Sequence, residues 1–269
     1  MKVSAVVVSH GHAAELERSL PPLEAQVDEL LVIANVPGSL PASLQQSVTN
    51  DRAHAPARTP GLQQSVTCLV NDRPRSLAAN VNAGIAATCG ELVLAANPDA
   101  VPEPGAVEEL RRFMEDHPRC GVAGPRMHYP DGSWQPSRRR FPTVGGTVVR
   151  RTPLRRVLAP GRRHYLLDER PAEPVEADWM LGAFLLMRRA MLDEIGGWDG
   201  GFRHYGEDID LCYRAARAGW ERWYVPAAVV RHDYAAVIDR RFLTRHTLWH
   251  LRGMLRFVRK HPERLLALR

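Results

Sequence analysis

Short apolar runs alternate with amphipathic stretches along the chain. The apolar runs predict buried strands at residues 3–8, 30–34, 66–70, 91–96 and 223–230. The amphipathic stretches predict helices at residues 13 to about 26, 76–87 and 104–117. Strands buried on both faces of a sheet are continuously hydrophobic, as these runs are. The strand–helix–strand order therefore predicts an α/β fold with a parallel central sheet, in which ligands bind at the carboxyl ends of the strands.

Polar residues follow three of the predicted strands. Ser9 ends the first, Asn35 follows the second, and Asn97-Pro98-Asp99 follows the fourth. Pro98 has no N–H to donate to a sheet, so the strand ends there and Asp99 lies on a tight turn. Asp99 is either an ordinary turn acid or a functional group at the binding edge of the sheet.

Three acids open a helical pattern late in the chain. Glu207, Asp208 and Asp210 begin it, and Gly219 closes it. Acids in a first turn can simply complement the helix dipole. However, Glu207 and Asp208 are adjacent and cannot share one helical face. A carboxylate among Tyr and Trp side chains is also a natural general base. This stretch is therefore the candidate catalytic centre.

Two segments are strongly basic. Residues 132–167 contain nine arginines and no acid, which predicts a mobile loop with a short helix. It is either a solvated face or a clamp for pyrophosphate or an anionic acceptor. The tail from residue 239 has nine Arg or Lys against two acids and predicts a helix, with an apolar face made by Leu248, Leu251, Leu255 and Val258. Such a helix either lies on an anionic membrane or docks on the protein's own core.

Composition narrows the class of protein. The 269 residues, 45% of them hydrophobic and 25% charged, suffice for one large α/β domain or two smaller ones. A net charge of +6 favours anionic partners. Four dispersed cysteines without a CxxC pair argue against a zinc ribbon or a disulfide framework and favour a reducing compartment. No apolar run is long enough for a signal peptide or a membrane span, so we expect a cytoplasmic protein.

A short duplication, residues 44–49 repeated at 62–67, lengthens a surface loop.

An ordered series of short motifs between about residues 3 and 235 resembles the inverting glycosyltransferases of family two, and most closely their bacterial rhamnosyltransferase-like branch. The matching residues are Val6-Val7-Val8-Ser9, Asn82-Ala83-Gly84-Ile85, Asn97-Pro98-Asp99, Pro130-Asp131-Gly132-Ser133, Gly182-Ala183, Arg188-Arg189, Gly196-Gly197-Trp198-Asp199, the run from Tyr205 to Leu211, Val225-Pro226 and His232. The resemblance implies a GT-A fold, with a Rossmann-like, mostly parallel central sheet flanked by helices and a C-terminal helical tail. It also implies a nucleotide-binding half at about residues 1–100, an acceptor half at about 101–235 and a basic amphipathic tail at 236–269.

The resemblance also implies an activity and roles for its residues. A sugar, with rhamnose or another hexose as the best guess, would move from a dTDP-, UDP- or GDP-linked donor to a hydroxyl of a sugar, lipid-linked or small-molecule acceptor. Asp99 would bind Mg²⁺ or Mn²⁺, which bridges the donor phosphates, and His232 can approach the same ion. Asp208 would be the base that deprotonates the acceptor, with Glu207 orienting the site and Asp210 holding the local structure.

The remaining positions fall into two groups. Donor binding is assigned to Ser9, His10, Asn35, Arg75, Asn97 and Asp99. Acceptor contacts are assigned to Trp179, Gly182, Ala183 and Tyr205. Some positions depart from the family pattern: Ala34-Asn35 stands where many relatives have Asp-Asn, His10-Gly11 replaces Tyr-Asn, and Ser76-Leu77 replaces Gly-Phe. These departures fall in the nucleotide pocket and leave the base preference open.

Two other readings remain. A nucleic-acid-binding protein would use the arginine-rich segment, but that segment lacks interleaved aromatic residues apart from Phe141, and no helix–turn–helix or zinc pattern is present. A relative that binds nucleotide without turnover is disfavoured by the intact Asp99 and Asp208. No GxGxxG follows the first strand, which excludes a Rossmann dehydrogenase. We therefore expect a glycosyltransferase that does not bind nucleic acid, with peripheral membrane contact through the tail and the oligomeric state left open.

Overall fold

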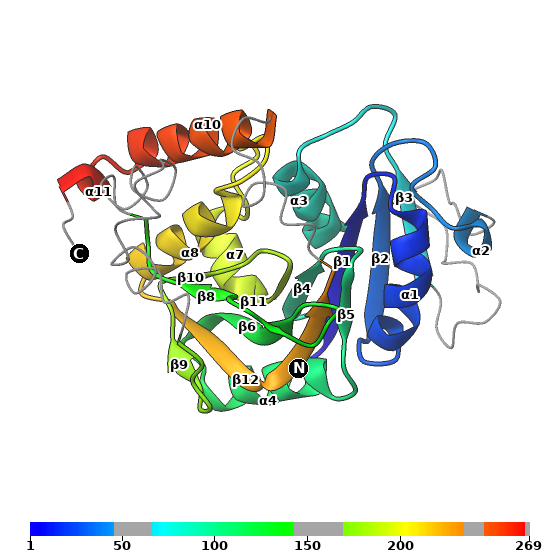
Figure 1. Ribbon diagram of the computed structural model, residues 1–269, viewed down its shortest axis with the longest axis horizontal. Coiled ribbons are helices and arrows are strands. Elements are labelled where there is room, and N and C mark those ends of the chain that lie inside the picture. The colour runs from blue at the N-terminus through cyan, green and yellow to red at the C-terminus, as the bar shows by residue number, and fades with distance from the viewer. Residues whose placement is uncertain (46–65, 143–168, 234–244, 267–269) are drawn as a thin grey trace.

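A ten-stranded sheet forms the centre of the computed structural model, which describes residues 1–45, 66–142, 169–233 and 245–266 (Figure 1). Its main path runs in the order β3 (Val66–Val70), β2 (Glu29–Ala34), β1 (Val3–Ser9), β4 (Leu92–Ala96), β11 (Phe184–Arg188), β6 (Cys120–His128), β12 (Glu221–His232) and β5 (Ala100–Pro102). Two short strands extend it: β7 (Trp134–Gln135) pairs with β6, and β9 (Val175–Glu176) pairs with β12.

The two halves of the sheet differ in strand direction. The strands β3, β2, β1 and β4 run parallel to one another. Beyond them, β11 is antiparallel to both β4 and β6, and β12 is parallel to β6 but antiparallel to β5. The sequence predicted a mostly parallel sheet, and the structure adds this mixed second half. A separate two-stranded ribbon, β8 (Arg138–Arg139) with β10 (Trp179–Met180), lies beside it.

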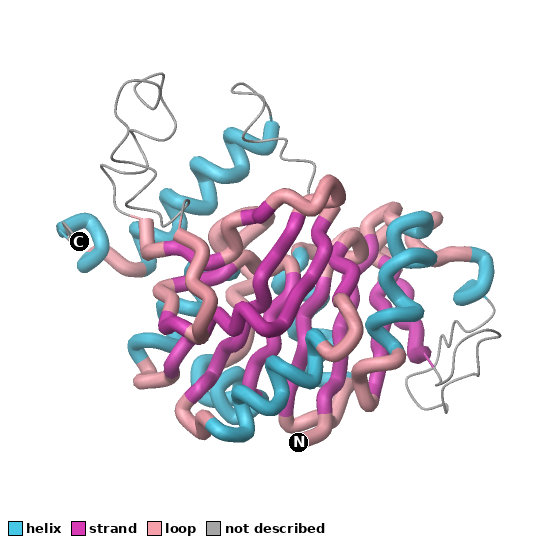
Figure 2. The backbone as a smooth tube through the Cα atoms, turned by 60° about the horizontal axis from the view of Figure 1, so that its bottom comes forward, coloured by secondary structure: helices cyan, strands magenta, loops and turns pink. Residues whose placement is uncertain are grey.

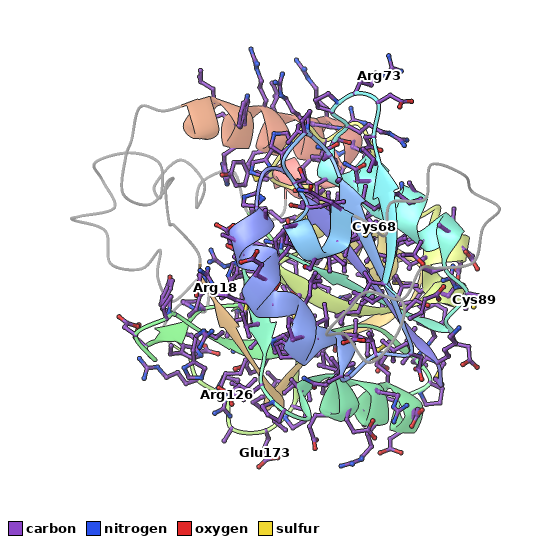
Figure 3. All side chains as sticks on the ribbon, turned by 90° about the vertical axis from the view of Figure 1, so that its right-hand side faces the viewer. Arg18, Cys68, Arg73, Cys89, Arg126 and Glu173 are labelled. Carbon is purple, nitrogen blue, oxygen red and sulfur yellow. The ribbon has the colours of Figure 1, made fainter. Side chains whose placement is uncertain are left out.

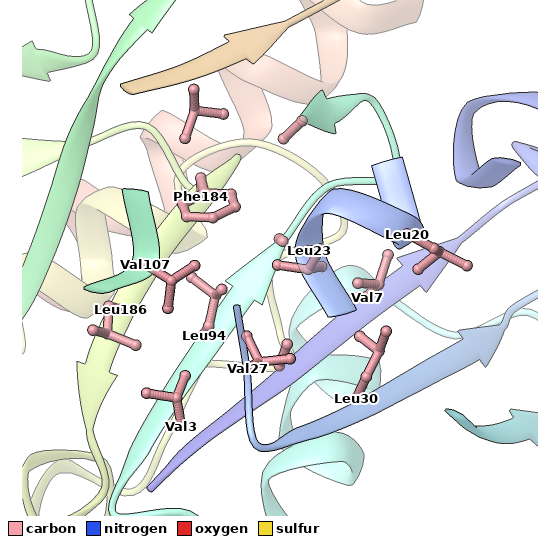
Figure 4. Close-up of a cluster of buried hydrophobic side chains, with 14 of the residues drawn as sticks. Val3, Val7, Leu20, Leu23, Val27, Leu30, Leu94, Val107, Phe184 and Leu186 are labelled. Atoms are coloured by element: carbon pink, nitrogen blue, oxygen red, sulfur yellow. The ribbon is translucent and has the colours of Figure 1, made fainter. Parts of the chain in front are cut away.

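Helices cover both faces of the sheet (Figure 2). On one face lie α1 (Ala13–Glu24) and α4 (Ala106–Asp116), and on the other lie α3 (Leu77–Ala87), α7 (Arg189–Ile195) and α8 (Glu207–Arg217). Side chains of β1 alternate between them: Val7 packs in the first cluster with Leu20 and Leu23 (Figure 4), and Val6 packs in the second. Burial on both faces explains why β1 is a continuous apolar run.

The sequence located these elements well. All five predicted strands are present, and β12 is longer than expected at both ends. The helix α3 begins where predicted, because the Ser76 hydroxyl accepts a hydrogen bond from the Ala79 N–H at 3.2 Å and so caps it. Eight of the twelve residues of the short duplication lie in 46–65, and six of the nine arginines of the basic segment lie in 143–168. Both stretches are outside the described residues.

The chain ends in α10 (Arg245–Lys260) and α11 (Glu263–Leu266), and a short α2 (Ala42–Gln45) follows β2. Figure 1 shows α10 on the outer side of α8, away from the sheet. Met254 and Phe257 bury α10 against the second core cluster. The leucines of the predicted apolar face do not make this contact and are exposed, which the sequence pattern could not decide.

The cysteines carry no disulfide. Cys68 is buried and Cys89 is exposed (Figure 3). Cys120 and Cys212 are buried as well, and all four are free thiols. Burial raises the pKa of Cys68 to about 11 and so keeps this thiol protonated at neutral pH. No helix in the described ranges is both long and apolar enough to cross a bilayer.

Candidate active site

The carboxyl ends of the first two parallel strands hold a network centred on the Asn35 amide. Its Oδ1 accepts from the Arg75 backbone N–H and from Asn71 Nδ2, both at 2.8 Å. Its Nδ2 donates to the Arg75 carbonyl at 2.9 Å and lies 3.0 Å from His10 Nδ1. The structure therefore brings together three residues assigned to donor binding, His10, Asn35 and Arg75. Asn35 fixes the backbone at Arg75, whose side chain is exposed.

Ser9 lies at the end of β1 and is fully buried. Its hydroxyl donates to the Ser39 carbonyl at 2.7 Å and accepts from the His12 N–H at 3.2 Å. These bonds tie the loop after β1 to the loop after β2. The Ser9 side chain thus shapes the edge of the pocket through the backbone.

Asp99 meets His232 at the next strand ends, because β5 and β12 pair with His232 opposite Ala100. His232 Nε2 lies 3.5 Å from Asp99 Oδ1, and its Nδ1 lies 3.1 Å from Gln135 Oε1. Burial raises the pKa of Asp99, but hydrogen bonding and charge interaction with His232 outweigh it and bring the pKa below its usual value. Asp99 is therefore an anion, and its side chain is 26% exposed.

A carboxylate oxygen beside an imidazole nitrogen fits a divalent cation such as Mg²⁺ or Mn²⁺. Asp99 and His232 would be its protein ligands. In the part of the chain that the structure describes, no group of three or more His, Cys, Asp or Glu side chains could hold a metal ion. Mg²⁺ is commonly held between one or two carboxylates and substrate phosphates, and Asp99 could supply such a carboxylate.

The two adjacent acids lie at the start of α8. Gly206, with φ of 95°, precedes the helix, and Tyr205 before it has φ of 71°, a conformation that is costly for a residue with a side chain. Asp208 Oδ2 accepts from the Gly182 N–H at 3.1 Å, and Oδ1 accepts from the Ile209 N–H at 2.9 Å. Two backbone donors therefore hold the Asp208 carboxylate in one orientation.

Glu207 is buried deeper than its neighbour. Its Oε2 has no hydrogen-bond partner within the described residues, whereas Asp208 is partly exposed. Burial, and then the Asp208 charge, raise the pKa of Glu207. Burial also raises the pKa of Asp208, although the N–H groups of Gly182 and Ile209 oppose this. The pair thus holds a proton more tightly than ordinary carboxyl groups do.

Of the residues assigned to acceptor contacts, Gly182 contacts Asp208 directly. A side chain on Gly182 would contact the Asp208 Cβ at 3.2 Å, so only glycine leaves this approach free. The next residue, Ala183, accepts from the Asn97 N–H at 2.8 Å, which joins the Asp208 side of the site to the strand end that carries Asp99. Tyr205 lies in an aromatic cluster with His204 and His250, at centroid distances of 4.0 and 6.0 Å.

Trp179 brings the described part of the arginine-rich segment to the site. Its indole N–H donates to the Arg140 carbonyl at 2.7 Å, and the Arg139 guanidinium lies 5.6 Å from the centre of its ring. The Arg139 charge also acts to lower the pKa of Asp208. Sequence reasoning did not single out Arg139, since it is one of nine similar arginines.

A second set of residues missed from the sequence lies on α10. A Cβ on Gly253 would stand 2.2 Å from the Tyr205 carbonyl oxygen, so α10 packs directly on the backbone before α8. Asp210 is fully buried and binds Arg214 Nε at 2.7 Å, His261 Nε2 at 2.8 Å and Lys260 Nζ at 2.9 Å. The chain end therefore holds the helix that carries Asp208.

Comparisons with known proteins place these features in context. A family model described as glycosyltransferase like family 2 matches residues 4–252. The N-acetylglucosaminyl-diphospho-decaprenol L-rhamnosyltransferase of Mycobacterium tuberculosis is 37% identical over 149 residues, which are 53% of this chain and 47% of that one. The rhamnosyltransferase WbbL of Escherichia coli K12 is 38% identical over 90 residues, 34% of this chain and 33% of WbbL. The chain thus spans about half the length, or less, of these relatives.

Solved structures show the same fold at low identity. GalNAc-T7 with UDP, GalNAc and Mn²⁺ has a TM-score of 0.61 and 17% identity, over 87% of this chain and 44% of that one. A mannosyltransferase from Pyrobaculum calidifontis with GDP-Man and Mn²⁺ has a TM-score of 0.60 and 17% identity, over 95% of this chain and 64% of that one.

Proposed function

The chain belongs to glycosyltransferase family 2 and has the GT-A fold, and from this premise we propose that it moves a sugar from a nucleoside-diphosphate donor to an acceptor hydroxyl with inversion. The observation that carries the proposal is that hydrogen bonds connect two acidic groups with different surroundings. Asp99 with His232 lies on one side and Asp208 on the other, linked through the Asn97–Ala183 bond and the adjacent Gly182–Asp208 bond.

On the donor side, His10, Asn35 and Arg75 surround the place for the nucleotide, and Asp99 and His232 would hold Mg²⁺ or Mn²⁺ beside the diphosphate. When bound, such an ion neutralises the negative charge of the leaving diphosphate. The ionised state of Asp99 supports this role. The Mn²⁺ in the two structural neighbours supports a divalent ion as well. On this proposal, residues up to about 100 bind the donor and residues of about 101–235 supply most of the acceptor side.

On the acceptor side, Asp208 takes the proton from the attacking hydroxyl. Inversion needs a single base on the face opposite the leaving group. The hydrogen bonds from Gly182 and Ile209 keep that carboxylate oriented. Glu207, with its raised pKa, stays protonated near neutral pH and leaves the negative charge on Asp208.

Two relatives suggest the substrates. Their names specify rhamnose transfer, and the mycobacterial name specifies a diphosphate-linked polyprenol as acceptor. We infer a rhamnose or other hexose donor linked to dTDP, UDP or GDP, and a lipid-linked acceptor reached from the cytoplasmic face of the membrane. The alternative is a protein that binds the nucleotide without turnover.

A donor panel tests the proposal. Nucleotide release is measured with thymidine-, uridine- and guanosine-linked sugars, with and without a chelator, for the wild type and for Asp99→Ala. We expect one donor class to be turned over, chelation to abolish turnover, and Asp99→Ala to weaken metal-dependent donor binding at least about tenfold. Asp131→Ala is the matched control, because Asp131 is an exposed turn acid bonded to Ser133. Full activity in excess chelator would refute the metal assignment, and donor binding without any release would favour the alternative.

A further inference from the structure

The outer face of α10 combines exposed leucines with arginines. Leu248, Leu251 and Leu255 are 60%, 46% and 49% exposed, and their spacing places them along one side of the helix. Apart from Val70, they are the only large hydrophobic side chains exposed in the described residues. Three such leucines on one short helix form a patch rather than scattered surface residues.

Arg252 and Arg259 extend this patch. Both are exposed. Arg252 follows Leu248, and Arg259 follows Leu255, by four residues, about one helical turn. Neither forms an ion pair with a carboxylate in the part of the chain that the structure describes. Lys260, by contrast, is bound to Asp199 and Asp210 on the inner side.

The three exposed leucines are not needed to pack α10 on the core. The opposite face of α10 is already packed, through Met254 and Phe257 in the second core cluster and through Gly253 against the Tyr205 carbonyl. Ion pairs of Asp199 with Arg256, and of Asp210 with Lys260 and His261, fix the same face. The helix therefore holds its position without the leucines, which remain available to something outside the chain.

We propose that the outer face of α10, formed by Leu248, Leu251, Leu255, Arg252 and Arg259, docks on an anionic lipid surface with the helix lying in the plane of the membrane. Apolar side chains that enter the headgroup region, flanked by cations that meet acidic lipids, are the combination such a surface binds. A second copy of the chain fits less well. A two-fold pairing of this face would place the arginines of both copies in one interface, and like charges repel.

Docking has a consequence for the site, which rests on the proposed function. The inner face of α10 packs on Tyr205 and binds Asp210, on the two sides of Asp208 in the sequence. A membrane on the outer face thus brings the Asp208 side of the site close to the lipid surface. A lipid-linked acceptor would then reach Asp208 without leaving the membrane.

Vesicle flotation tests the docking directly. The full chain is mixed with vesicles of phosphatidylglycerol and phosphatidylcholine, or of phosphatidylcholine alone, at roughly 50 mM and roughly 500 mM salt, where screening lengths differ about threefold. We expect flotation only with the anionic vesicles and a steep loss at high salt. The triple variant Leu248→Ser, Leu251→Ser, Leu255→Ser should partition at least about tenfold less. The variant Arg252→Glu, Arg259→Glu should partition less by on the order of a hundredfold.

Two controls match these variants. Val70→Ser removes the remaining exposed large hydrophobic side chain of the described residues. Arg112→Glu with Arg119→Glu changes the net charge as much as the α10 charge variant does, but at α4 and just after it. All of these side chains are exposed, so each variant is expected to melt near the wild type. Controls that float like the wild type support a local patch.

Three results would overturn the proposal: a wild type that ignores anionic vesicles at low salt, a control charge variant that loses as much binding, or a wild type that dimerises only while the leucines are present. The last result would assign the face to a second copy. Flotation needs neither donor nor turnover. A protein that floats but releases no nucleotide therefore counts against the proposed function alone.

Discussion

Asp99 and Asp208 are the acids on the two sides of the proposed site, yet their surroundings move their pKa values in opposite directions. His232 brings the pKa of Asp99 below its usual value, whereas burial raises the pKa of Asp208. Asp99 is thus ionised at neutral pH, lies beside an imidazole and is suited to hold a cation. Asp208 lies next to Glu207 and has a raised pKa, so it exchanges its proton nearer to neutral pH than Asp99 does. Carboxyl groups whose environments separate their pKa values in this way have different roles in catalysis.

The two sides also differ in how they are built. The donor side follows from strand order, because Ser9, Asn35 and Asp99 come directly after strands whose ends lie at one edge of the sheet. The Asp208 side depends on a helix start that is held by Gly182 from another strand connection and by α10 from the chain end. Alterations on the Asp208 side should therefore affect both chemistry and stability.

The largest effect is expected at Asp208 itself. Asp208→Asn keeps the shape of the side chain and removes the proton acceptor, and its amide oxygen can accept from only one of the Gly182 and Ile209 N–H groups. Turnover should fall about 10²- to 10⁴-fold, the usual contribution of a general base, while donor affinity stays near the wild type. Turnover at saturating donor and separate donor titration measure the two quantities. Near-normal turnover of Asp208→Asn would remove Asp208 from the proposed role.

The sequence predicts the donor side of the proposed site better than the Asp208 side. Strand positions and the polar residues after them could be predicted, because a buried strand leaves a continuous apolar run and a proline marks its end. The contact of Asn97 with Ala183 could not, because it depends on β11 inserting antiparallel between β4 and β6. Local pattern does not encode which strand will be the neighbour.

The contacts of α10 could not be predicted from the sequence for a related reason. Periodicity placed Leu248, Leu251 and Leu255 on one face but could not tell which face of the helix is buried. The packed face carries Met254, Phe257 and the partly buried Val258, so the helix is apolar on two sides. Gly253, Lys260 and His261 add contacts on that face that carry no hydrophobic signal. Asp210 is 50 residues from Lys260 and 51 from His261. Only the folded chain brings them together.

Asp210→Asn tests the dependence of the Asp208 side on the chain end. The change leaves Arg214 without its buried counter-charge and weakens the contacts of Lys260 and His261, and loss of one partner from a buried ion pair costs about 3 kcal/mol. Asp199→Asn is the control. Asp199 is 16% exposed and its partners Arg256 and Lys260 are 44% and 33% exposed, so solvent screens these ion pairs and we expect a smaller loss, of about 1 kcal/mol. Urea unfolding compares the two variants, and equal midpoints would contradict the structural role of Asp210.

Gly253→Ala tests the close approach of α10. Alanine favours a helix over glycine by about 1 kcal/mol, but here its Cβ would meet the Tyr205 carbonyl, a backbone atom that cannot move alone. We expect a net destabilisation of about 1–2 kcal/mol, together with a loss of turnover, because the start of α8 must shift. Gly200→Ala, with no heavy atom within 4 Å of its Cβ, should be close to neutral. A stabilised Gly253→Ala with full turnover would show that this contact does not position Asp208.

The smallest effect on turnover is expected at Glu207, where the pH dependence carries the information. The raised pKa means that the folded protein holds the Glu207 proton more tightly than the unfolded chain does. Its contribution to stability is therefore fully present below the unfolded pKa, near 4.3, and is lost as pH rises through the folded pKa. Glutamine cannot ionise, so Glu207→Gln should lose less of its stability than the wild type as pH rises.

Near neutral pH the glutamine resembles protonated Glu207, and turnover should fall less than about tenfold, in contrast to Asp208→Asn. Urea midpoints from about pH 5 to about pH 9, a range that spans the expected titration of a raised carboxyl, compare the wild type with Glu207→Gln. Parallel curves would mean that Glu207 titrates normally. An inactive Glu207→Gln beside an active Asp208→Asn would move the base by one residue, because the buried Glu207 would then be the carboxylate that accepts the proton.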